Sequence, residues 1–71
     1  MSYFVKWRRS LGGEIIEHYV GYGQPSEALD FACATLNLSP IEIWIENEHG
    51  NPIADKQLIV DHCRKRGLLP R

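Results

Sequence analysis

Three histidines and two cysteines are the side chains of this 71-residue chain most suited to binding a metal. Structural zinc sites typically use CxxC or HxxxH spacings, and neither spacing occurs here. His62 and Cys63 are adjacent, so on a helix their side chains would point about 100° apart and make poor joint ligands. We therefore predict neither a metal site nor a bound cofactor. The candidate ligands considered are His18, His49, His62, Cys33 and Cys63.

Nucleophilic catalysis would require a cysteine within hydrogen-bond reach of a base, in a cleft that holds a substrate. Cys63 with His62 and Cys33 with His18 are the candidate pairs, but a chain this short rarely builds such a cleft alone. Glu42 and Glu46 would lie about 13 Å apart on one strand, farther than the ~5–9.5 Å between glycosidase carboxylates. We predict no catalytic residues, so the protein is not expected to be an enzyme.

Charge is segregated along the sequence, although the formal net charge is only −1. All the cations lie near the two ends and the middle carries acids, a pattern that informs about partners rather than about fold. If the basic ends converge, they form a phosphate-contact patch and the chain is a nucleic-acid-binding module, which is our second-ranked hypothesis. That patch would consist of Lys6, Arg8, Arg9, Arg64, Lys65 and Arg66.

Aromatic and charged residues alternate with apolar ones in two predicted strands, so they should share the sheet face turned away from the helices. That face could be a stacking platform for nucleic-acid bases. Alternatively, cross-strand ion pairs could form there, with the aromatic rings making a protein contact. We favour ion pairing, because carboxylates would repel phosphate on the same surface. The predicted contact residues are Phe4 and Trp44, flanked by Lys6, Arg8, Glu42 and Glu46.

The composition is that of one small folded domain covering residues 1–71, with 44% hydrophobic and 24% charged residues. No apolar run approaches the ~20 residues of a membrane span, and the start lacks the order of a signal peptide, so we predict no membrane partner and a cytoplasmic location. Cys33 and Cys63 fall at apolar positions of predicted helices. Small secreted scaffolds usually carry four or more cysteines, so we predict reduced, packed thiols.

Hydrophobic periodicity predicts a hairpin at the start of the chain. Residues 3–9 alternate with a period of two, and residues 14–22 resume after Gly12 and Gly13. We expect a loop somewhat longer than the tightest type. The register of the second strand is open, because Ile15 and Ile16 cannot both face inward without a bulge.

The rest of the chain alternates helices with strands. Pro25 suits the first position of a helix that ends before Pro40, and Ile41, Ile43 and Ile45 alternate with polar residues in a strand that should face this helix. Residues 53–54 predict a very short edge strand, and Asp55 should cap a helix that ends at Gly67. The sequence thus predicts a two-layer α+β fold of order ββαβ(β)α, with a sheet of three or four strands and two helices on one face. Its core-facing helix residues are Ala28, Leu29, Ala32, Cys33 and Leu36, then Leu58, Ile59, His62 and Cys63.

Two resemblances involve the first half of the chain. The segments YFVKWR at 3–8, YVGY at 19–22 and PSEALDF at 25–31 resemble the N-terminal arm-type DNA-binding domain of tyrosine recombinases, although Glu14 and Glu17 stand where that family is typically basic. Extended through the NEHGN turn at 47–51, the same half is similar to small bacterial ββαβ proteins of unknown function. The second is the better match, and it implies no activity or site residues.

Together these observations favour a small interaction or accessory protein that contacts a protein partner, or a second copy of itself as a homodimer, through the uncovered sheet face.

Overall fold

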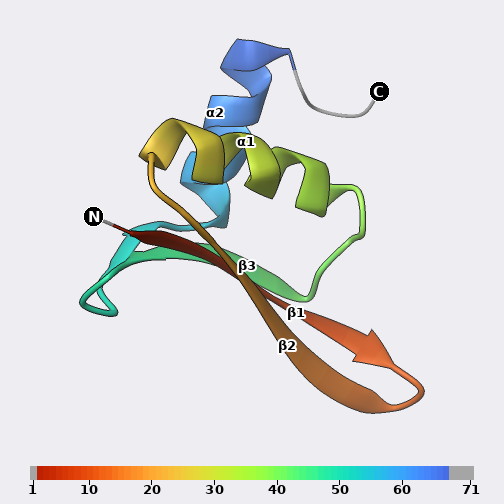
Figure 1. Ribbon diagram of the computed structural model, residues 1–71. Coiled ribbons are helices and arrows are strands. Elements are labelled where there is room, and N and C mark those ends of the chain that lie inside the picture. Colours follow the sequence, from red (N-terminus) through yellow and green to blue (C-terminus); the bar gives the residue numbers. More distant parts are fainter. Residues whose placement is uncertain (1, 68–71) are drawn as a thin grey trace.

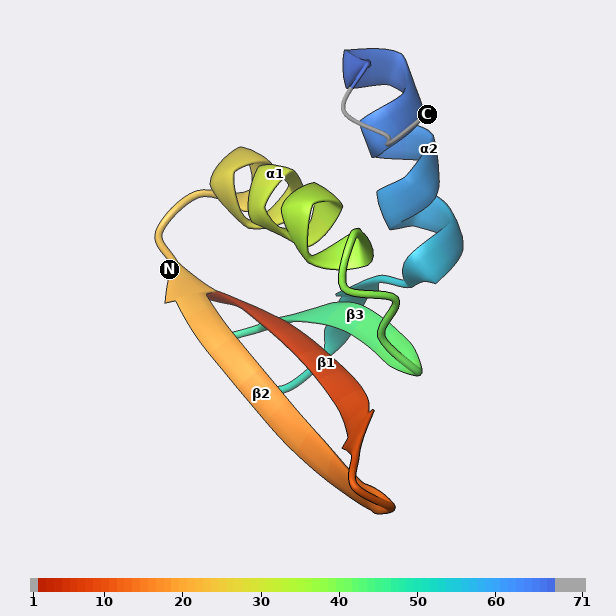
Figure 2. The ribbon, with the colours of Figure 1, turned by 90° about the vertical axis from the view of Figure 1, so that its right-hand side faces the viewer.

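A computed structural model describes residues 2–67 of the chain (Figure 1). Over these residues the protein forms a four-stranded antiparallel sheet of order β2-β1-β3-β4 and two helices. Both helices lie on one face of the sheet, with the C-terminal end of α2 farthest from it (Figure 2). The α+β class, the two layers and the order ββαββα are those predicted from the sequence. The elements are β1 (Tyr3–Leu11), β2 (Glu14–Tyr22), α1 (Pro25–Leu36), β3 (Glu42–Asn47), β4 (Pro52–Ala54) and α2 (Lys56–Arg66).

The β1–β2 turn is tighter than expected. Leu11 pairs with Glu14, so that only Gly12 and Gly13 connect the strands. Both glycines have positive φ angles, 58° and 86°, which is the backbone that a two-residue type I′ turn requires. The pairing continues without a shift to Tyr3 opposite Tyr22. No bulge is needed for the adjacent isoleucines, because Ile16 faces the helices while Ile15 remains 66% exposed on the other side.

β1 is central because it pairs with β2 on one side and with β3 on the other, antiparallel in both cases. β2 and β3 therefore run parallel to each other on either side of β1, and the connection through α1 crosses over this central strand, which is the kind of connection to which the right-handed rule applies. β4 adds three residues beyond β3, with an irregular register at Ile45 and Glu46.

The helix ends follow the sequence signals. Pro25 begins α1, and Glu27 places a carboxylate in its first turn, where the helix dipole is positive. Asp55 caps α2 by accepting a 2.9 Å hydrogen bond from the backbone N–H of Leu58. Gly67 ends α2 in the left-handed conformation with a φ of 67°, which a residue without a Cβ adopts at low cost.

The core lies between the sheet and the two helices. Ile43 is 4% exposed, which confirms that the third strand turns its isoleucines inward. Two expected core positions were wrong: Ile41 precedes β3 and is 51% exposed, and Leu58 lies on the outer side of α2 at 45%. Leu58 stays exposed because α1 already covers β1, β2 and β3. α2 packs only against α1, β3 and β4, so its outer side has no neighbour among the other described elements. The buried apolar residues are Val5, Trp7, Ala28, Ala32, Cys33, Ile43, Ile45, Ala54, Ile59 and Cys63.

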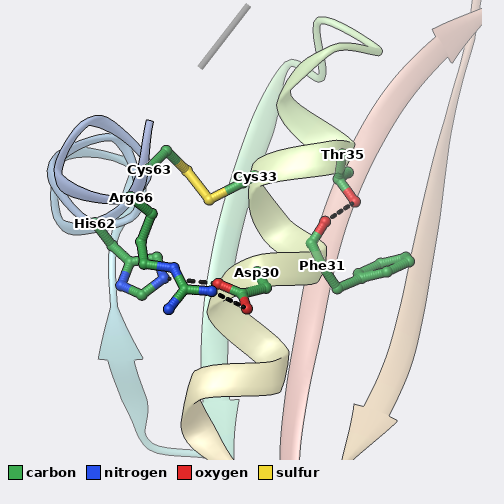
Figure 3. Close-up of a disulfide and its surroundings, with 7 residues drawn as sticks. All are labelled: Asp30, Phe31, Cys33, Thr35, His62, Cys63 and Arg66. Carbon is green, nitrogen blue, oxygen red and sulfur yellow. Dashed lines mark hydrogen bonds and ion pairs between the residues drawn. A yellow bond between two sulfur atoms is a disulfide. The ribbon is translucent and has the colours of Figure 1, made fainter. Parts of the chain in front are cut away.

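The two cysteines form a disulfide, which corrects the prediction of reduced thiols (Figure 3). Cys33 projects from α1 and Cys63 from α2, with their Cα atoms 5.6 Å apart, inside the range that a disulfide can bridge. Both residues are buried, as their apolar positions predicted. The pairing depends on how closely the helices cross, which neither the cysteine count nor the helix patterns reveal.

Candidate functional site

The sheet face turned away from the helices carries the candidate site. In the part of the chain that the structure describes, neither helix covers this face (Figures 1 and 2). The alternation of each strand brings residues from three neighbouring strands onto it. We call this surface the open face: Phe4, Lys6 and Arg8 of β1, Glu17 and Tyr19 of β2, and Glu42, Trp44 and Glu46 of β3.

Glu46 holds the indole of Trp44 in place. The Trp44 Nε1–H donates a 2.6 Å hydrogen bond to Glu46 Oε2, and Lys6 Nζ lies 3.0 Å from Glu46 Oε1. The hydrogen bond from Trp44, followed by that from Lys6, lowers the pKa of the Glu46 carboxyl below its usual value of 4.5. The indole is thereby fixed by a charged acceptor, so its ring is presented in one orientation.

Arg8 lies between two carboxylates and beside the same indole. Its Nη1 donates a 3.1 Å hydrogen bond to Glu42 Oε2, and its Nη2 lies 4.0 Å from Glu17 Oε1. Its guanidinium carbon is 5.2 Å from the centroid of the Trp44 ring, within the range of a cation–π contact. The predicted cross-strand ion pairs of Lys6 and Arg8 with the strand glutamates are therefore confirmed.

Phe4 forms the second aromatic part of the open face. A Cβ on Gly21 would lie 3.1 Å from Phe4 Cε1, so the ring rests on the glycine of the neighbouring strand. Tyr19 meets Phe4 edge-on with the ring centroids 6.4 Å apart, and Tyr19 is 68% exposed. Three aromatic residues thus line a face whose charges are mutually paired.

Lowering the pH should reduce the free energy of unfolding, in part because Glu46 becomes protonated. Because its pKa is lower in the folded protein than in the unfolded chain, Glu46 adds stability above its usual pKa of 4.5 and loses it as the pH falls through the lowered value. We expect the free energy of unfolding to fall less between about pH 6 and about pH 3 in Glu46→Gln than in the wild type. Urea titrations at the two pH values measure this difference, and equal losses in both proteins would contradict it.

A second polar cluster joins the helices. Asp30 of α1 accepts a hydrogen bond at 3.0 Å from His62 Nε2 when that nitrogen is protonated, and a 3.2 Å hydrogen bond from Arg66, both from α2 (Figure 3). The hydrogen bond with His62 comes first among the causes that lower the pKa of Asp30. The cluster lies beside the disulfide, so covalent and polar links both hold α2 against α1 (Figure 3).

The predicted phosphate patch is divided among different surfaces. Lys6 and Arg8 are on the open face, and strand alternation turns Arg9 toward the opposite side of the sheet. Arg64, Lys65 and Arg66 belong to the last turn of α2, which stands away from the sheet (Figures 1 and 2). Arg64 lies 3.7 Å from Asp61, and Arg66 is bound to Asp30. Within residues 2–67 the structure therefore does not gather the six residues of the predicted patch on one surface.

The arrangement offers little to small-molecule chemistry. Among residues 2–67 no three potential ligands of the His, Cys, Asp and Glu types converge. Two hollows border β4: one of about 240 Å³ lies against Ile53 and His49, and one of about 340 Å³ is lined by Pro52, Ile53, Ala54, Asp55 and Leu58. The first is smaller than the ~300–1,000 Å³ typical of ligand sites, and the second is near the low end of that range. The candidate contact residues Phe4 and Trp44 do share one face, where both are half-buried. Sequence reasoning missed Tyr19, although a two-residue turn at Gly12 and Gly13 would have placed it opposite Lys6.

The comparisons with known proteins give no family to which the chain could be assigned. No family model, no curated protein and no solved structure matches it. None of the helices in the described residues has the length and apolar character needed to cross a membrane. The resemblances noted from the sequence stay predictions, and the open face has to be interpreted from its own chemistry.

Proposed function

We propose that the protein is a non-enzymatic interaction or accessory module that contacts another protein through the open face. The observation that supports this most strongly is that Trp44, Phe4 and Tyr19 gather on the sheet face that neither helix covers. Aromatic residues and arginine are enriched at protein interfaces and among the residues that contribute most to binding. Trp44 is already ordered by Glu46 and Arg8, so little side-chain entropy is lost when a partner covers it.

The charges of the open face favour a protein over a nucleic acid. Lys6 and Arg8 face three carboxylates, so no net positive field remains there to attract a polyanion. A protein partner can instead match alternating charges around an aromatic centre, as the rims of protein interfaces do.

The proposal is tested by removing the indole. We expect Trp44→Ala to reduce partner capture or self-association at least about tenfold, which is typical for a central aromatic contact, and to change the melting temperature much less. Ile41→Ala is the matched control, because Ile41 is exposed but lies outside the open face. Quantitative mass spectrometry of captured proteins and sedimentation velocity measure the two effects. Equal capture and equal self-association in all three proteins would contradict the proposal.

Nucleic-acid binding is the alternative function. Contacts with phosphates release counterions, so a nucleic-acid binder should show saturable binding near 50 mM salt that weakens steeply toward about 200 mM. We expect no such binding to single-stranded or duplex oligonucleotides in fluorescence anisotropy. Tight, salt-sensitive binding that Arg64→Ala with Arg66→Ala weakens would promote this alternative.

The cytoplasmic location is part of the proposal, and the disulfide is the observation that opposes it. Disulfides persist mainly in oxidising compartments, whereas cytoplasmic ones are usually transient. Alkylation of free thiols in intact cells, followed by mass spectrometry, determines whether Cys33 and Cys63 are paired where the protein functions. A fully oxidised pair at steady state would argue for an oxidising compartment.

A further inference from the structure

The free edge of the sheet at β2 is long and has few of the features that normally prevent strand pairing. Natural edges are usually short, bulged, or interrupted by proline or by charged side chains, most often lysine. β2 has nine residues, carries no lysine, arginine or proline, and pairs with β1 without a register shift. Its charged residues are Glu14, next to the turn, and Glu17, which is paired with Arg8 of β1. Its exposed side chains include Ile15 at 66% and Tyr19 at 68%.

The opposite edge shows the contrast. β4 has only three residues, begins at Pro52 and leads within one residue into α2. Its register with β3 is irregular at Ile45 and Glu46. These features protect the β4 edge from pairing, and none of them is present at β2.

The turn determines which backbone groups of β2 point outward. In an antiparallel pair, hydrogen-bonded and non-hydrogen-bonded residue pairs alternate, and the pair that closes a two-residue turn is hydrogen-bonded. The carbonyl of Arg8 confirms the alternation, because it accepts a 2.8 Å bond from the N–H of Ile41 on the β3 side rather than bonding to Glu17. The N–H and C=O groups directed to the free edge therefore belong to Ile15, Glu17, Tyr19 and Gly21.

We propose that the occupant of this edge is a second copy of the chain, paired antiparallel through β2 about a two-fold axis at His18, so that two sheets become one continuous sheet. The four residues whose backbone groups point to the free edge are placed symmetrically about position 18. In this register every one of these N–H and C=O groups can therefore form a hydrogen bond with the second copy. A two-fold axis at Glu17 would oppose two glutamates, and one at Tyr19 would place Ile15 opposite Gly23, beyond the end of β2. The hydrogen-bonded pairs are Ile15 with Gly21 and Glu17 with Tyr19, each formed twice.

The side chains fit this register on both faces. On the helix side, Ile16 lies opposite Val20 of the second copy in a non-hydrogen-bonded pair, where side chains approach most closely. Both are β-branched and half-buried in the single chain, so pairing covers their remaining apolar surface. On the side of the sheet away from the helices, Ile15 lies opposite Gly21 of the second copy, which has no side chain to obstruct it and lies beside the ring of Phe4.

The charges are also compatible with a symmetric pair. Glu17 lies opposite Tyr19 of the second copy. In that second copy Lys6 of β1 is paired with Tyr19, so the next residue across the sheet from Glu17 is a cation. No two like charges stand directly opposite each other across the new contact. This inference does not rest on the proposed function, because it concerns the strand edge and not the open face, which the pairing would extend without covering.

The first test removes one outward N–H. Glu17→Pro deletes a backbone donor at the free edge and leaves the β1–β2 hydrogen bonds intact, since edge strands tolerate proline when the N–H faces solvent. Glu17→Ala removes the same carboxylate and keeps the donor. In sedimentation equilibrium we expect a dimer for the wild type and for Glu17→Ala, and at least a tenfold weaker dimer for Glu17→Pro. Circular dichroism establishes that both variants are folded.

The second test determines the register. In a non-hydrogen-bonded antiparallel pair the Cα atoms are ~4.5 Å apart, which a disulfide can span. Under mild oxidation we expect His18→Cys to form a covalent dimer, because residue 18 lies opposite residue 18 of the second copy. Glu17→Cys should form much less, because residue 17 lies opposite residue 19 and the two introduced cysteines are two positions apart along the strand. A monomeric wild type, or equal cross-linking at both positions, would overturn the proposal. A dimer that Trp44→Ala dissociates and Glu17→Pro does not would overturn it and support the open face instead.

Discussion

Loss of the Cys33–Cys63 disulfide is expected to lower the melting temperature by roughly 15–30 °C. The bond closes a loop with a sequence separation of 30 residues, and the loss of that constraint on the unfolded chain costs about 3–4 kcal/mol. A domain of this size has a total stability of only ~4–10 kcal/mol, so the loss is a large fraction of it. For 60–100 residues, each kcal/mol shifts the melting temperature by about 4–8 °C.

The measurement is thermal unfolding with and without reductant, in the wild type and in Cys33→Ser with Cys63→Ser. Both cysteines are almost completely buried, so reduction has to be driven through unfolding and verified by thiol titration. We expect reductant to lower the wild-type melting temperature and to leave the double variant unchanged. Reduced wild-type protein that melts at the same temperature as the oxidised form would show that the pair adds nothing to stability.

Truncation of Ile45 to alanine is expected to reduce the free energy of unfolding by about 2–5 kcal/mol. Ile45 is 1% exposed, belongs to β3 and is among the largest fully buried side chains of the core. The cost combines the lost burial of apolar surface with the cavity left behind, because the sheet and both helices surround the site. Urea unfolding monitored by circular dichroism gives the value.

Ile41→Ala is the matched control for this substitution. It makes the same chemical change four residues earlier, at a position that is 51% exposed. We expect its effect to stay within about 0.5 kcal/mol, as is usual at surface positions. If both variants lost a similar free energy of unfolding, Ile45 would not be more deeply buried than Ile41, and the structure of β3 would be contradicted.

The elements of this fold were predictable because their signals are local. The alternation of Ile43 and Ile45 with polar neighbours defines β3, and Pro25, Asp55 and Gly67 mark helix ends through the backbone geometry each prefers. Strand alternation also predicts that Phe4 and Trp44 share one face, since the period of two applies wherever the strand lies.

The contacts between residues of different elements were decided only by the tertiary structure, because they depend on how far apart the elements lie. The antiparallel pairing of β1 with β3 brought Arg8 beside Trp44 and Glu42, residues more than thirty positions away. The crossing of α1 and α2 decided that the two cysteines can pair, because a disulfide requires Cα atoms within about 7 Å and helix periodicity carries no information on that separation. The unshifted β1–β2 pairing, set by two glycines with positive φ, left β2 as a nine-residue edge without a bulge. Local preferences therefore determined the elements and their faces, whereas contacts between distant segments decided which chemical groups meet.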